Sequence, residues 1–126
     1  MKATELMIGD LIKIKGHLDY DKVQEIARDE NMQWYISFAC SATLFRAYEF
    51  EPIPLTPEIL EKNGWKETEY WHEYEDGNTI IQYSLSNIWG IINEIEIEHF
   101  KCEYVHQLQH LLRLCGLNEL ADNFKV

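Results

Sequence analysis

The sequence has 126 residues, of which 46% are hydrophobic and 13% aromatic, and its formal net charge is −11. This composition suits a packed globular protein and excludes a disordered chain, while the length predicts one domain or two small subdomains that share a core. Nucleic acids and anionic membranes are bound by basic surfaces, so the acidic balance disfavours both as direct partners.

The sequence contains no apolar run near the roughly 18 residues that a membrane span requires. Its first residues, Met1–Leu6, lack the basic segment and apolar stretch of a signal peptide. We therefore expect a cytoplasmic protein. The three cysteines, Cys40, Cys102 and Cys115, form no C-x-x-C pair, which is typical of a reducing compartment and of thiols that pack in the core.

The first half of the chain shows short strands joined by tight turns. A turn at 7–10 precedes the first of them, and the expected strands cover 11–15, 22–26, 33–38 and 48–51. Strands of this length, about ten residues apart, predict a small SH3-like β-barrel or a strongly bent sheet. We place it in a β-rich subdomain of residues 1–55.

A short helix opens the second half. Thr56 suits the N-cap, Pro57 the first helical position and Gly64 the residue beyond the C-cap, which predicts a helix over Pro57–Asn63. The stiff segment Pro52–Leu55 separates this helix from the strands before it.

Three antiparallel strands are expected next. The first lies within 65–75, Asp76-Gly77 is a strong hairpin signal, and the return strand covers 79–85. The third lies within 88–100, where Glu94-Ile95-Glu96-Ile97-Glu98 alternates with a period of two. Its glutamates could form a divalent-cation site or an acid/base pair, but a solvated face that discourages edge aggregation explains them more simply.

The clearest helix spans Tyr104–Cys115 and ends before Gly116. Its apolar residues form one stripe, which predicts that it packs across the sheet face carrying Ile95 and Ile97. A last helical turn is expected at 118–123, followed by frayed residues. The second subdomain, residues 56–126, is thus expected to be a helix, a three-stranded antiparallel sheet and a helix. The fold class is α+β, and the two subdomains could form one compact domain.

His106 and His110 are four residues apart on the polar side of this helix. The spacing is that of a zinc-binding pair and resembles the His-Glu-x-x-His of zinc proteases. However, Gln107 cannot act as a general base, and the pattern supplies no third ligand. Two solvated surface histidines are the simpler interpretation, a metal site is the alternative, and we expect no cofactor.

Two stretches resemble a known group of proteins. Pro52–Trp65, and Tyr104–His110 with Leu114-Cys115-Gly116, resemble uncharacterised small proteins of gut anaerobes of the Bacteroides group and their prophages. In many of those proteins Glu follows the first His of the helix, where this chain has Gln107. The resemblance implies a bacterial or phage setting, and it carries no activity and no catalytic residue.

The sequence shows no P-loop, G-x-G-x-x-G, G-x-S-x-G or paired C-x-x-C. The leading hypothesis is therefore a non-enzymatic interaction protein of a prophage or mobile element, whose partner is a protein, either a second copy or a basic partner. The candidate interaction surface is Tyr70, Trp71, Tyr74 and Trp89, and the alternative is that these aromatic side chains fill the core.

Two other hypotheses remain open. A small hydrolase or metal-binding protein would use His106 and His110, or His72 and His99, which could meet across the sheet, together with nearby carboxylates. An acidic decoy would imitate nucleic acid in front of a DNA-binding protein, with carboxylates spaced like phosphates along one surface.

Overall fold

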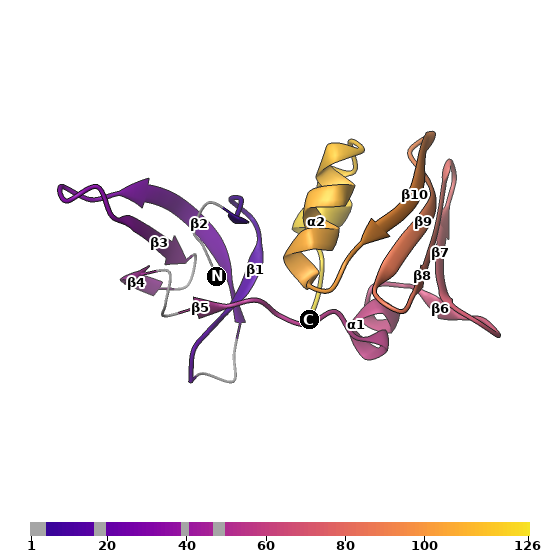
Figure 1. Cartoon of the computed structure of the whole chain (residues 1–126), viewed down its shortest axis with the longest axis horizontal. Coiled ribbons are helices and arrows are strands. Elements are labelled where there is room, and N and C mark those ends of the chain that lie inside the picture. Colours follow the sequence, from indigo (N-terminus) through magenta and orange to yellow (C-terminus); the bar gives the residue numbers. More distant parts are fainter. Residues whose placement is uncertain (1–4, 17–19, 39–40, 47–49) are drawn as a thin grey trace. The chain divides into compact units, whose positions relative to one another are not determined.

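The structure, a computed structural model, describes residues 5–16, 20–38, 41–46 and 50–126. The chain divides into two compact units, Met1–Ile53 and Pro54–Val126, which follow one another along the colour bar of Figure 1. Strands dominate both units, and within the described residues all α-helices belong to the second. The expected α+β class is therefore wrong, and the chain is mainly β.

The first unit contains one antiparallel sheet in the order β4-β3-β2-β1-β5. Strand β4 is not predicted from the sequence, because its residues, Ser-Ala-Thr-Leu-Phe-Arg, lack a clear period of two. The expected SH3-like barrel is wrong: β4 and β5 form the two edges of the sheet, and among the described residues they do not pair to close it. The strands are β1 (Leu11–Ile14), β2 (Tyr20–Arg28), β3 (Trp34–Phe38), β4 (Ser41–Arg46) and β5 (Phe50–Glu51).

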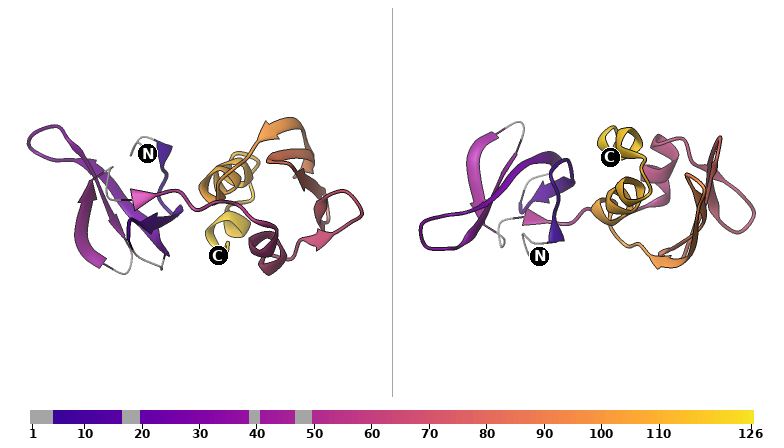
Figure 2. Two further views of the ribbon diagram at one scale, coloured as in Figure 1. Left: turned by 60° about the horizontal axis from the view of Figure 1, so that its bottom comes forward. Right: turned by 90° about the horizontal axis from the view of Figure 1, so that it is seen from above.

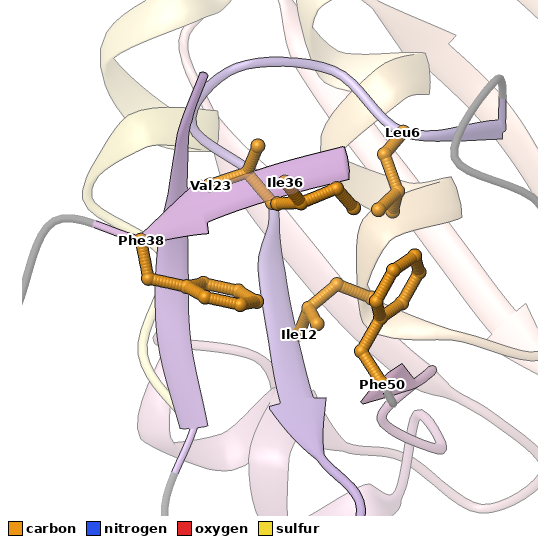
Figure 3. Packing of buried hydrophobic residues seen from close by; sticks show 6 residues of the cluster. All are labelled: Leu6, Ile12, Val23, Ile36, Phe38 and Phe50. Atoms are coloured by element: carbon orange, nitrogen blue, oxygen red, sulfur yellow. The ribbon is translucent and has the colours of Figure 1, made fainter. Parts of the chain in front are cut away.

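The predicted turn before β1 is confirmed, and a buried carboxylate holds it. Asp10 is fully buried, its Oδ2 accepts the backbone N–H of Met7 at 2.8 Å, and its carbonyl accepts the N–H of Val23 at 2.8 Å. The turn therefore ties β1 to β2 before the ladder begins. The core beneath the strands, shown in Figure 3, consists of Leu6, Ile12, Val23, Ile36, Phe38 and Phe50.

The second unit contains an antiparallel sheet of five strands, in the order β10-β9-β8-β7-β6. The expectation of a three-stranded sheet between two helices is therefore wrong. Each strand pairs with its neighbour in the sequence, so the sheet is a meander. The strands are β6 (Lys66–Glu67), β7 (His72–Asp76), β8 (Thr79–Ser84), β9 (Asn87–Ile92) and β10 (Ile95–Lys101).

The strand expected within 88–100 is in fact a hairpin. β9 and β10 are joined by Asn93 and Glu94, which both have positive φ, at 48° and 70°. Such a turn follows the twist of the strands, and Asn tolerates the left-handed region while Glu does so at a cost. Two hydrogen bonds hold the turn in place. The side-chain amide of Asn93 donates to the Cys115 carbonyl at 2.9 Å, and the backbone N–H of Asn93 donates to Thr79 Oγ1 at 3.0 Å.

The helices are α1 (Pro57–Lys62), α2 (Val105–Leu114) and α3 (Asn118–Asp122). The predicted start of α1 is confirmed, since Thr56 Oγ1 accepts the N–H of Ile59 and Pro57 opens the helix. The expectation that the last residues are frayed is wrong. The side chain of Asn63, at the end of α1, donates to the Lys125 carbonyl at 2.7 Å and accepts its N–H at 2.8 Å, which anchors the end of the chain.

The helices lie on one side of the second sheet, as the two views of Figure 2 agree. The sheet residues buried on that side include Ile81, Ile88 and Ile92, all fully buried. The prediction that α2 covers Ile95 and Ile97 is wrong for Ile95, which is 46% exposed. These two residues belong to the edge strand β10, whereas the buried apolar face lies on the central strands. Among the described residues, no helix is long and apolar enough to cross a membrane.

Candidate functional site

Aromatic side chains gather on the sheet face that is turned away from the helices. The Trp71 and Trp89 rings meet edge to face with centroids 6.1 Å apart, and Tyr70 lies next to Trp71 at 6.3 Å. The turn between β6 and β7 places Trp71 there, because Thr68 Oγ1 donates to the Trp71 carbonyl and accepts its N–H. Three of the four aromatic residues predicted to form an interaction surface thus lie together.

The fourth, Tyr74, lies on the opposite face. Its ring packs against the buried Trp65 with centroids 5.9 Å apart, and it pairs across the sheet with the fully buried Ile81. Burial, and then the neighbouring Asp76 carboxylate, raises the pKa of the Tyr74 phenol. Tyr74 therefore packs on the helix side of the sheet, apart from the other three aromatic residues.

Apolar residues extend the aromatic cluster across the sheet. Ile80 pairs with Ile91, and Gln82 pairs with Trp89, so all four side chains point to the same side. Ile80 is 38% exposed and Ile91 45%. Strand register adds Glu73 opposite Gln82 and Glu96 opposite Ile91. We call this surface the open face, and it consists of Trp71, Glu73, Ile80, Gln82, Trp89, Ile91 and Glu96.

A hollow with a volume of about 770 Å³ lies at the β9–β10 side of the open face. Trp89 and Ile91 give it apolar walls, and Glu96 and Glu98 give it acidic ones. The β10 ladder shifts register between Ile97 and Phe100, and His99 in this bulge adopts a φ of 48°. The predicted row of glutamates is shorter than expected, because Glu96 and Glu98 line the hollow together while Glu94 lies in the preceding turn.

The histidine pair of α2 differs from the expectation in the burial of His106. His106 is 5% exposed and therefore buried. It stacks on Tyr104 with centroids 5.9 Å apart, and it meets His110 edge to face at 5.5 Å. The interpretation as two solvated histidines is thus wrong for His106. Among the described residues, no third His, Cys, Asp or Glu completes a three-ligand set with the pair.

His72 and His99 do not meet across the sheet. They belong to β7 and β10, and both β8 and β9 lie between those strands. His99 is an exposed residue of the hollow, whereas the His72 ring contacts α1, with Nε2 at 3.3 Å from Glu61 Oε1. The structure therefore gives no shared site to His72 and His99.

One metal-ligating set was missed in the sequence. Among the described residues, one group of three side chains could hold a metal ion, namely Glu61, Glu67 and His72. Each offers one potential ligand atom, and these atoms lie within 4.8 Å of one another. Their spacing of six and five residues matches no helical or strand period. Only the register of the strands could have revealed this set of residues, since Glu67 stands directly opposite His72 in the β6–β7 ladder.

The described thiols are buried, as predicted for cysteines with a packing role. Cys102 is fully buried and Cys115 is 3% exposed, while Cys40 lies outside the described residues. Burial raises the pKa of the Cys102 thiol to about 12, and it raises that of Cys115 as well. The reactive thiolate is therefore scarce at neutral pH, which argues against a nucleophilic role for either residue.

This burial predicts slow alkylation. In the folded chain at pH 8, iodoacetamide should modify Cys102 at least about a hundredfold more slowly than in the urea-unfolded chain, because both access and thiolate are lost. Peptide mass mapping of the two samples measures the rate at each cysteine separately. Equal labelling of Cys102 in both samples would contradict the burial described here.

Comparison with known proteins finds no matching family model, no matching curated sequence and no matching solved structure. The assignment of a function therefore rests on the geometry of the second unit.

Proposed function

We propose that this chain is a non-enzymatic interaction protein that binds a basic protein segment through the open face. The observation that carries the proposal is the joint exposure of Ile80 and Ile91 beside the Trp71–Trp89 pair. Single exposed apolar residues are ordinary on protein surfaces, but contiguous apolar groups with polar rims are typical of interaction sites. Aromatic residues in particular are enriched where partners bind.

Charge defines the chemistry of the partner. Glu73 and Glu96 belong to the open face itself, Glu98 lines the adjoining hollow, and the whole chain carries a net charge of −11. A positively charged segment with apolar side chains would match both the walls and the rim of the hollow. A second copy of the chain would bring the same acidic rim against this one, which like-charge repulsion disfavours.

The resemblance to proteins of Bacteroides-group bacteria and their prophages supports a bacterial or phage setting for this interaction, and the proposed compartment is the cytoplasm. An acidic decoy for a DNA-binding protein is less well supported, because Ile80 and Ile91 lie beside Glu96 and break the run of carboxylates across the sheet. The open face is better suited to a partner that buries apolar side chains.

Selection from a random-peptide display library on the full chain tests the proposal. The selected peptides should combine Lys or Arg with apolar or aromatic residues. Synthetic versions should quench or shift tryptophan fluorescence in titrations, because Trp89 lines the hollow. Replacing Ile91 by Lys should weaken their binding at least about tenfold, since the change removes an apolar contact and adds a like charge.

Leu114→Lys is the matched control, because Leu114 is 80% exposed on α2 and away from the open face. This variant carries the same charge change and should bind the peptides as the parent chain does. Selected peptides that are acidic, or an affinity that Ile91→Lys leaves unchanged, would refute the proposal. A dimer in light scattering that Ile91→Lys dissociates would replace the basic partner by a second copy.

A further inference from the structure

We infer that Glu61, Glu67 and His72 bind one divalent transition-metal ion of the zinc class, at the junction of α1 with the β6–β7 hairpin. This site is separate from the open face and independent of the proposed function. Its residues come from three elements, α1, β6 and β7. Each offers a ligand atom, and the three atoms lie within 4.8 Å of one another.

The distances are close to those of a bound ion. Zinc binds imidazole nitrogen and carboxylate oxygen at about 2.0–2.2 Å, so tetrahedral ligands stand roughly 3.4 Å apart. His72 Nε2 and Glu61 Oε1 are already 3.3 Å apart. The carboxylate of Glu67 is on an exposed residue, so a change of side-chain rotamer can complete the approach.

The local fold holds the three ligands in place. Glu67 and His72 are directly opposed in the β6–β7 ladder. Thr68 closes the turn between them, since its N–H and its hydroxyl both donate to the Trp71 carbonyl at 2.7 Å. Glu61 is presented from the last turn of α1, which packs against β6. The pairing of Glu67 with His72 therefore does not depend on a flexible loop.

Electrostatics favours a cation at this place. Two carboxylates face a single imidazole, and among the ion pairs of the described residues none joins Glu61 or Glu67 to a Lys or Arg. A divalent ion would neutralise both carboxylates. One imidazole with two carboxylates suits Zn²⁺, Mn²⁺ or Co²⁺ better than Mg²⁺ or Ca²⁺, which bind oxygen ligands alone. Three protein ligands leave a position for water.

Metal titration of the full, untagged chain tests the inference. The chain is stripped with EDTA and used in a Cys40→Ser background, so that this thiol supplies no ligand. Calorimetry with Zn²⁺ and visible spectroscopy with Co²⁺ should both show one ion per chain, and Zn²⁺ should raise the unfolding temperature. Glu67→Gln should weaken Zn²⁺ binding at least about tenfold and abolish this rise.

Glu67→Gln is the decisive variant, because Glu67 is exposed and its replacement should leave the metal-free circular dichroism unchanged. His72→Gln should behave alike, though it also removes the contact with Glu61. His99→Gln, in the distant bulge of β10, is the matched control and should bind as the parent does. Absence of stoichiometric binding, or a site lost in His110→Gln and kept in Glu67→Gln, would overturn the inference.

Discussion

Replacing Gly90 by Ala is expected to destabilise the second unit severely. Gly90 lies in the middle of β9 with a φ of 130°, which other residues rarely adopt. A Cβ at this position would overlap the carbonyl oxygen of Ile80 and lie 3.1 Å from its carbonyl carbon. Because the obstacle is backbone of the central strand β8, no side-chain rotation can relieve it.

We expect the loss in unfolding free energy to exceed about 4 kcal/mol, which only severe packing or backbone conflicts produce. Urea unfolding followed by circular dichroism measures it, and hydrogen exchange locates it through lost amide protection in β8 and β9. Gly77→Ala is the control, since Gly77 also has a positive φ but would have no heavy atom within 4 Å of a Cβ. Similar stabilities of the two variants would contradict the predicted clash.

Replacing Gln109 by Ala should destabilise the second unit by about 2–4 kcal/mol, a large effect for a polar residue. Gln109 is fully buried in α2, and its side-chain amide donates to the Ala121 carbonyl of α3 at 3.0 Å. The variant loses this hydrogen bond and leaves space between the two helices. Urea unfolding monitored by circular dichroism measures the loss.

Two further variants separate the causes. Gln109→Leu restores most of the volume, so it should recover part of the loss and leave about 1 kcal/mol for the hydrogen bond. Leu114→Ala changes a residue of the same helix that is 80% exposed, and it should change the stability little. If Gln109→Ala proved as mild as Leu114→Ala, the described packing of α3 on α2 would be wrong.

Local sequence signals predicted local structure well. The N-cap at Thr56 was correctly placed. The Asp76-Gly77 signal correctly indicated a hairpin, but its two turn residues are Gly77 and Asn78, because Asp76 still pairs with Thr79 in the ladder. The hairpin at Asn93-Glu94 was missed because apolar and acidic residues continue to alternate after it. Its positive φ values are stabilised by Thr79 and by the end of α2, and no local pattern reveals such partners.

The periodicity of the sequence also predicted the wrong solvent-exposed side for α2. His106 and Gln109 lie opposite the apolar stripe, yet both are buried. Gln109 is covered because α3 packs against that side of the helix. The sequence of α2 alone gives no information about the position of α3. The open face was recognised in part from its aromatic residues. The register that adds Ile80 and Ile91 to it required the structure.

The two sheets differ in the sequence separation between strands that pair with each other. Every ladder of the second sheet joins consecutive strands, whereas β1 in the first sheet must pair with β5, beyond three intervening strands. Short loops close at a lower entropic cost than long ones, so the meander can grow hairpin by hairpin. On a ribosome, the outer edge of β1 stays unpaired until Phe50–Glu51 has been synthesised. During that interval the nascent chain exposes a strand edge to neighbouring chains.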